Sequence, residues 1–230
     1  MRGIASLYML KQLMIDVAGD ENAKPCEYFD MIAGTSTGGS VLSVSASAFG
    51  VLIFISIRLI AIMLGRLRMA VPKCIEAYNV LSKEIFGDGE NNELAAPIEG
   101  AWYDEKTFEK AVGEFLASSL CEPGFDKNSF LANPDPDACK VYVQNIPDLR
   151  LELMTGTRFV LTCEASNIND QLAAHLRTYN NPNVSNSNSD TTIVAAARAT
   201  SAAPSYFHQK EIHGKMFIDG GLAANNPISL

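Results

Sequence analysis

A serine between two glycines, directly after a short apolar segment, most restricts the fold of this 230-residue chain. Residues 27–33 are aromatic and apolar, which predicts a buried strand. Ser36 follows within Gly34-x-Ser36-x-Gly38, the spacing of a sharp strand-to-helix turn that lifts a serine clear of a sheet. Glycine is needed at the flanking positions because a Cβ would clash there. The pattern indicates a nucleophilic serine on an α/β fold.

Two other structures share this pattern. A glycine-rich turn after a strand can also cradle a phosphate or be a plain tight turn. The absence of a Gly-Lys-Ser or Gly-Lys-Thr after Ser36 argues against a Walker-type loop. If a helix follows, its free N–H groups point toward Ser36, where they can stabilise an oxyanion.

Helical patterns alternate with short apolar segments along the rest of the chain, which favours an α/β fold with a mostly parallel sheet. The apolar spacing predicts helices over residues 4–18 and 69–86, stopped by Gly19 and Gly87. Asp104 predicts the start of a third helix over 105–118, and the Ala-rich residues 191–200 predict a fourth. Strands are expected at 27–33, 140–143, 158–163 and 215–218. The polar stretches 88–100, 122–138 and 180–190 are expected to be loops.

The size and charge of the chain limit its class. The length fits one domain, and a net charge of −8 argues against a nucleic-acid partner and against strong attraction to anionic lipid. The five cysteines are dispersed and form no CxxC pair, so neither a disulfide framework nor a zinc site is expected. We therefore expect reduced cysteines, and the first residues show no secretory signal.

A nucleophilic serine needs a group that takes its proton, and Asp219 is the first candidate. It ends an apolar segment and precedes Gly220 and Gly221, so burial would improve it as a base while the glycines leave room around it. The same Asp-Gly-Gly could be a simple turn. A histidine triad, for instance Ser36 with Asp190 and His208, is the alternative, although a surface or structural role is the ordinary expectation for each histidine: His175, His208 and His213.

Together these segments resemble the patatin-like phospholipase family. Gly34-Thr35-Ser36-Thr37-Gly38-Gly39 and Asp219-Gly220-Gly221 resemble its two signature motifs. Residues 25–30 are similar to the family's approach to the serine turn, 196–207 to the segment before its aspartate, and 225–227 to the segment after that aspartate. The resemblance covers most of the chain.

The resemblance implies a three-layer α/β fold and a serine lipid acyl hydrolase. Ser36 would attack an acyl ester of a phospholipid or acylglycerol while Asp219 takes the proton, giving an acyl-enzyme that water releases. It implies no metal and no other cofactor. The substrate would be lipid at a membrane or lipid-droplet surface, and the protein would be cytoplasmic or peripherally membrane-bound. No nucleic-acid partner is expected, and no protein partner is indicated.

The chain departs from the family pattern at both ends. The family begins with a strand and a Gly-Gly-Gly-x-Arg-Gly loop that forms the oxyanion hole, whereas here only Arg2 and Gly3 correspond. The chain stops at Leu230, so the family's C-terminal helices are also expected to be missing. Losing one oxyanion donor costs about 10²–10³ in rate. The alternative function is therefore a catalytically impaired fragment or pseudoenzyme that at most binds lipid or a partner.

Two stretches interrupt the single domain expected over 1–230. Residues 40–58 and 144–162 have no counterpart in the family pattern and resemble translated intron sequence. The apolar run that includes the first stretch is expected to extend the helix after Ser36. A buried core helix is another interpretation, and a transmembrane segment at 41–64 is possible but not favoured, because Gly50, Arg58 and several serines weaken it. If sequencing of the transcript shows both stretches as coding exons of stable protein, the intron hypothesis fails.

Overall fold

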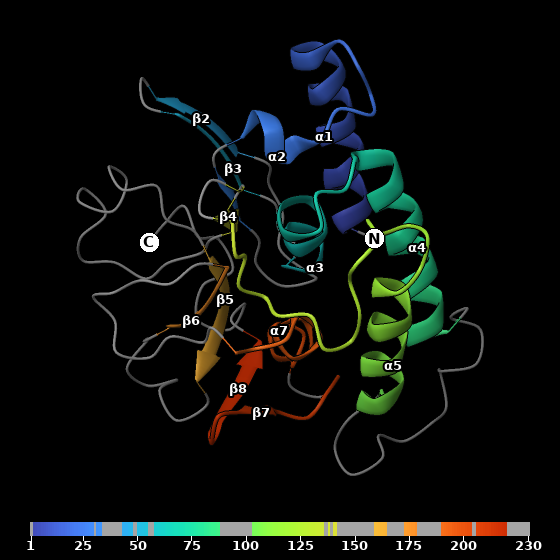
Figure 1. The fold of residues 1–230 in the computed structure, drawn as a ribbon, viewed down its shortest axis with the longest axis vertical. Coiled ribbons are helices and arrows are strands. Elements are labelled where there is room, and N and C mark those ends of the chain that lie inside the picture. Colours follow the sequence, from blue (N-terminus) through green and yellow to red (C-terminus); the bar gives the residue numbers. More distant parts are fainter. Residues whose placement is uncertain are drawn as a thin grey trace.

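A computed structural model describes most of the chain as helices, short strands and their connections (Figure 1). The described residues are 2–29, 31–33, 43–47, 50–54, 58–87, 103–135, 138, 140–141, 159–164, 173–178, 190–203 and 206–219. The helices are α1 (Arg2–Ala18), α2 (Pro25–Tyr28), α3 (Arg58–Ala61), the π-helical turn η1 (Ile62–Arg66), α4 (Val71–Phe86), α5 (Glu105–Leu116) and α7 (Ile193–Thr200). The strands are β1 (Met31–Ala33), β2 (Ser43–Ser47), β3 (Gly50–Phe54), β4 (Lys140–Val141), β5 (Phe159–Glu164), β6 (Ala173–Arg177), β7 (Lys210–Ile212) and β8 (Lys215–Asp219).

The long helices begin and end at the residues that the sequence marks. Gly19 follows α1 with a φ of 72° and donates its N–H to the Ile15 carbonyl at 2.9 Å. Gly87 ends α4 in the same way, with a φ of 70°. Asp104 caps α5, because its side chain accepts the Thr107 N–H at 2.7 Å. The predictions for these three helices, and for the helix now seen as α7, are confirmed.

The strands that the structure describes form two four-stranded sheets, ordered β2-β3-β1-β4 and β6-β5-β8-β7. Strand β1 pairs in parallel with β3 and with β4. The pairings of β2 with β3, and of β5 with β6 and β8, are antiparallel, as is that of β7 with β8. Strand β4 also contacts β5, which joins the two sheets. The arrangement is α/β as expected, but the described pairings do not confirm one mostly parallel sheet.

Two predictions of local structure were wrong. The first two residues of the strand expected at 27–33 are the end of helix α2, because Pro25 suits a first helical turn and its carbonyl accepts the Phe29 N–H at 2.9 Å. The strand β1 begins only at Met31. The described residues of 40–58 show neither the expected helix extension nor a core helix, since residues 43–47 and 50–54 are strands and only Arg58 begins a helix, α3. Alternating serines in one strand, and valine and isoleucine in the other, favour extended backbone over helix.

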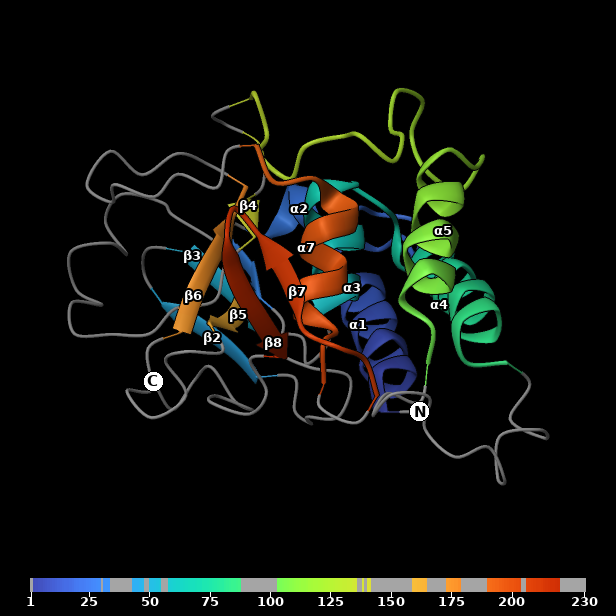
Figure 2. The same cartoon turned by 90° about the horizontal axis from the view of Figure 1, so that it is seen from below.

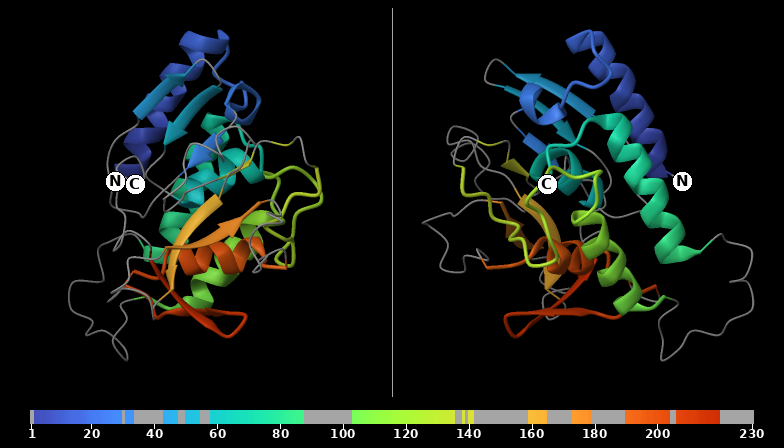
Figure 3. Two further views of the ribbon diagram at one scale, coloured as in Figure 1. Left: turned by 90° about the vertical axis from the view of Figure 1, so that its left-hand side faces the viewer. Right: turned by 45° about the vertical axis from the view of Figure 1, so that its right-hand side comes forward.

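The helices gather on one side of the described strands, as Figures 1 and 2 show. Helix α7 contacts β5, β7 and β8, and α3 contacts α7, β1 and β5. Helix α5 packs on α7, α4 on α5, and α1 on α4. Figure 3 shows the hairpin β2–β3 and the hairpin β7–β8 at opposite ends of the long axis. The core is therefore built between helices and strands contributed by the whole length of the chain.

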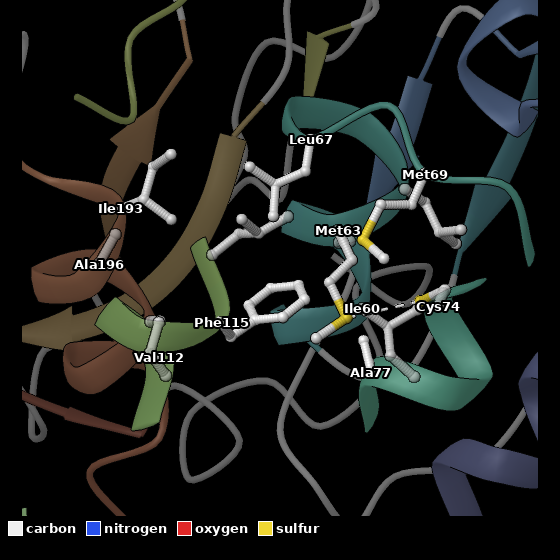
Figure 4. Close-up of a cluster of buried hydrophobic side chains, with 14 of the residues drawn as sticks. Ile60, Met63, Leu67, Met69, Cys74, Ala77, Val112, Phe115, Ile193 and Ala196 are labelled. Carbon is white, nitrogen blue, oxygen red and sulfur yellow. Dashed lines mark hydrogen bonds between the residues drawn. The ribbon is translucent and has the colours of Figure 1, made fainter. Parts of the chain in front are cut away.

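One connected set of buried side chains fills this core. It includes Leu7 of α1, Ile32 of β1, Met63 of η1, Phe115 of α5 and Phe217 of β8. Figure 4 shows Met63 beside Cys74 of α4, whose thiol donates to the methionine sulfur at 3.5 Å. Burial raises the pKa of the Cys74 thiol, and it raises that of Cys121 to about 11. Both cysteines, like Cys26, are buried and free of disulfides.

No helix among the described residues is both long and apolar enough to cross a bilayer. Within 41–64, the described residues include the strands β2 and β3 rather than one continuous helix. The polar segments expected as loops at 88–100 and 180–190 lie outside the described residues, apart from Asp190.

Candidate functional site

Asp219 is a buried carboxylate held by main-chain contacts. It is the last residue of β8 and is 2% exposed. Its N–H donates to the Ala202 carbonyl at 2.9 Å, and its register partner on β5 is Thr162. A buried carboxylate at the end of an apolar strand is the placement that the sequence predicts for this residue.

The surroundings of Asp219 come from β8 itself and from α7. Phe217 and Ile218 precede it and are buried, and Ala202, just beyond α7, is also buried. Thr192 caps α7 by accepting the Ala195 N–H at 3.1 Å. The alanines of α7 leave little bulk between helix and strand, so the helix contacts β8, and Figure 2 shows the two elements side by side.

Arg198 of α7 is a fully buried cation, with 0% of its surface exposed. Its Nη2 donates to the His208 carbonyl at 2.6 Å and lies 3.4 Å from a Glu105 oxygen. Its guanidinium carbon lies 5.0 Å from the centroid of the Phe207 ring. Burial lowers the pKa of the Arg198 guanidinium, while Glu105 and Glu109 raise it. Nε and Nη1 have no hydrogen-bond partner in the structure described.

A group of opposite charges joins α5 to α7, to the connection that follows α7, and to β7. His208 Nδ1 lies 2.7 Å from Glu105 Oε1, so Glu105 is shared between His208 and Arg198. Lys210 Nζ lies 2.6 Å from Glu109 Oε1. These contacts place two acids of α5 against three basic side chains from the C-terminal part of the chain.

The histidine triad considered from the sequence is not assembled from the residues proposed. Asp190 pairs with His213 at 3.2 Å, and His208 pairs with Glu105. His175 is on β6, opposite Leu161 of β5. The described residues therefore do not bring Asp190 and His208 together as one acid–histidine pair.

Several predicted site residues lie outside the described residues. They are Gly34, Thr35, Ser36, Thr37, Gly38 and Gly39 of the serine turn, and Gly220 and Gly221. Arg2 and Gly3 are in the first turn of α1. The strand β1 ends at Ala33, three residues before Ser36 in the sequence.

The described elements connect the strand before Ser36 to the strand that carries Asp219. Strand β1 pairs with β4, β4 contacts β5, and β5 pairs with β8. Helix α3 contacts β1, β5 and α7. The chain segments on which the predicted nucleophile and base depend therefore belong to one packed arrangement.

Arg198, on the helix α7 that packs against β8, was not singled out by reasoning from the sequence. The sequence did contain a signal for Arg198, because it is the one charged residue of the segment Ile193–Thr200. The other residues of that segment are apolar, apart from the final threonine. No group of three His, Cys, Asp or Glu side chains able to hold a metal ion occurs among the residues described.

Comparison with known proteins gives the same family as the motifs. The chain matches the family model described as patatin-like phospholipase over residues 1–230. It is similar to calcium-independent phospholipase A2-gamma of Mus musculus, with 26% identity over 238 residues, and of Homo sapiens, with 24% over 246 residues. The rabbit protein, from Oryctolagus cuniculus, is 25% identical over 246 residues. Each alignment covers 100% of this chain and 24% of the relative, so the chain spans about a quarter of the length of these relatives.

Proposed function

The chain belongs to the patatin-like phospholipase family, and from this membership we propose that it is a serine lipid acyl hydrolase with Ser36 as nucleophile and Asp219 as base. The observation that carries the assignment of the base is the burial of Asp219 at the end of β8. A carboxylate removed from water and held through its main chain suits proton transfer to and from a nearby hydroxyl. The relatives named phospholipase A2 support a lipid ester as the substrate.

The proposed reaction begins with proton transfer. Asp219 accepts the hydroxyl proton as the Ser36 oxygen attacks the acyl carbonyl of the lipid, giving a tetrahedral oxyanion. The oxyanion collapses, the bond to the alcohol portion of the lipid breaks, and that alcohol leaves with the proton from Asp219. The fatty acyl group is then bound to Ser36 as an ester.

Water completes the cycle through the same two residues. Asp219 takes a proton from a water molecule as the water oxygen attacks the carbonyl of the acyl-enzyme. The second tetrahedral intermediate then collapses and releases the fatty acid. The proton returns to the Ser36 oxygen. N–H groups near the serine turn, from Gly38 and Gly39, and those at the start of α1, near Arg2 and Gly3, are the proposed donors to the oxyanion.

The wider setting is also a proposal. We infer one patatin-like domain over 1–230, of the family's three-layer architecture, with additions at 40–58 and 144–162. Strands β2 and β3 lie in the first addition, and β5 begins within the second. The substrate is lipid presented at a membrane or droplet surface, which places the protein in the cytoplasm or peripherally on a membrane. No metal takes part in the chemistry.

A histidine-dependent esterase is the second candidate, and the pairing of His208 with Glu105 is the observation that favours it. A carboxylate that orients a histidine is one part of a serine–histidine–acid triad. In that case Glu105 replaces the Asp190 considered from the sequence. The two candidates differ in whether activity depends on Asp219 or on His208.

A fluorophosphonate probe tests the proposal directly, because it bonds covalently to an activated serine. The unchanged chain and the variant Ser36→Ala are incubated with the probe, and the labelled peptide is located by mass spectrometry. Labelling at Ser36 that is lost in the alanine variant supports an active nucleophile. Absence of labelling in folded protein supports instead the catalytically impaired member of the family.

A further inference from the structure

We propose that Arg198 is a positioning residue for Asp219, because it holds both ends of the connection whose Ala202 carbonyl accepts the Asp219 N–H. This inference rests on the proposed role of Asp219 as the base. The connection runs from α7 to β7, and its described residues are 201–203 and 206–209. Arg198 itself touches neither substrate nor reacting atoms in this proposal.

Stability alone does not account for a buried arginine at this place. Removing a cation from water is unfavourable, and the cost is recovered only with good pairing and saturated hydrogen bonding. Arg198 is 0% exposed, its distance to Glu105 is 3.4 Å, and Nε and Nη1 have no partner in the described structure. An apolar side chain of similar size would fill the same space at lower cost.

The far end of the connection is held by the Arg198 side chain. Nη2 donates to the His208 carbonyl at 2.6 Å, and the guanidinium lies over the Phe207 ring. Glu105 of α5 contacts both His208 and Arg198, so it fixes this end from a second element. Three contacts therefore converge on residues 207 and 208.

The near end is held by the Arg198 main chain. Its carbonyl accepts the Ser201 N–H at 3.2 Å, and the Ala199 carbonyl accepts the Ala202 N–H at 3.3 Å. Between the two ends, the Ala203 carbonyl accepts the N–H groups of Tyr206 and Phe207, each at 3.0 Å. The described parts of the connection, 201–203 and 206–209, are therefore bound to Arg198 at both ends.

Ala202 links this connection to Asp219, the proposed base. It lies within the turn, and its carbonyl accepts the Asp219 N–H at 2.9 Å. If the turn opens at His208, Ala202 can shift, and the end of β8 loses one of its main-chain anchors. A displacement of about 1 Å in a catalytic group can lower the rate by about 10²-fold.

The test compares three variants of the full 230-residue chain. Arg198→Met removes the charge but keeps the length, and Arg198→Lys keeps a cation without the forked guanidinium. Lys210→Met is the matched control, because it also removes a cation that pairs with α5 but has no contact with Ala202 among those described. For each we measure kcat and KM on a micellar phospholipid ester, and the hydrogen exchange of the Asp219 amide by NMR.

We expect Arg198→Met to lower kcat by about 10- to 100-fold with KM little changed, and to speed exchange of the Asp219 amide. For Arg198→Lys we expect values of kcat and of the Asp219 exchange rate between those of Arg198→Met and the unchanged chain. Lys210→Met should match the unchanged chain in both. Equal exchange and equal kcat in Arg198→Met and Lys210→Met overturn the proposal. If Arg198→Met does not fold, Arg198→Lys decides, and behaviour identical to the unchanged chain overturns it.

The exchange measurement separates this proposal from the proposed function. An unchanged chain that is folded but inactive contradicts the hydrolase assignment, whereas the Asp219 amide still reports whether Arg198 holds the turn. A normal rate of exchange at Asp219 in Arg198→Met contradicts the positioning role even in an active enzyme.

Discussion

Thr162 of β5 is the register partner of Asp219 of β8, at the end of their antiparallel pairing. On the other side, the Asp219 N–H is bound to the Ala202 carbonyl. The candidate base is thus held by main-chain contacts that a change of side chain does not remove. Its chemistry can therefore be altered while its place in the sheet is kept.

Asp219→Asn keeps the shape of the side chain but removes its basicity. We expect kcat for ester hydrolysis to fall by about 10²–10⁴, the usual contribution of a general base, while the unfolding temperature stays close to that of the unchanged chain. Asp190→Asn is the control, since Asp190 pairs with His213. Full activity in Asp219→Asn would exclude the proposed dyad.

His208→Gln and His213→Gln test the second candidate function. For the Ser–Asp dyad we expect both variants to keep most of the hydrolytic activity, because neither histidine takes the serine proton. The assay is the same ester hydrolysis, with circular dichroism to verify folding. A loss of activity confined to His208→Gln would favour the triad with Glu105.

Met63→Ala removes a fully buried side chain from the centre of the core. A methionine-to-alanine change at such a site costs about 2–5 kcal/mol of unfolding free energy. Met9 of α1 is 55% exposed, and we expect Met9→Ala to stay within about 0.5 kcal/mol of the unchanged chain. Urea denaturation measures both, and similar midpoints for the two variants would contradict the packing described around η1.

Asp104 gives a pH-dependent prediction. The hydrogen bonds from Thr107 lower the pKa of the Asp104 carboxyl below its ordinary value. A lowered pKa in the folded state means that the stabilisation is present above about pH 4 and is lost as the pH falls through the folded pKa.

Asp104→Ala should therefore reduce stability by about 1 kcal/mol near neutral pH, and the difference from the unchanged chain should shrink below about pH 4. Asp104→Asn keeps a capping oxygen without the titration, so its contribution should not vary over this range. Thermal unfolding at several pH values measures both effects. A difference between Asp104→Ala and the unchanged chain that grows on acidification would contradict the assignment.

Removal of metal ions should leave the activity unchanged. The proposed chemistry uses only a serine and a carboxylate. Dialysis against EDTA, followed by the ester assay with and without added calcium, measures this. Activity that disappears on dialysis and returns with calcium would show that a metal takes part.

The sequence was most informative where a local signal decides the structure. Gly19, Gly87 and Asp104 act within one helical turn, so the ends of three helices followed from them. The hairpin β2–β3 was missed because an apolar run fits a helix or a strand equally well, and here pairing with β1 selects the strand.

The candidate site was less predictable, because part of it depends on contacts between residues that are distant in the sequence. Asp219 could be placed at the end of a strand from its own neighbours, but the contact of Arg198 with Glu105 joins residues far apart in the sequence. No local pattern encodes such a pair. The lone charge in an Ala-rich helix indicates only that a partner is required.

The order in which this chain folds follows from the pairings of β1. Helices α1, α4 and α5 need only nearby residues, whereas β1 near residue 31 must meet β4 near residue 140. Closing so long a loop costs entropy before any contact is gained, and contacts between distant segments slow folding. The sheet that contains β1 should therefore assemble after the helices, so a kinetic trap in refolding would contain helices but lack the paired strand that precedes the predicted nucleophile.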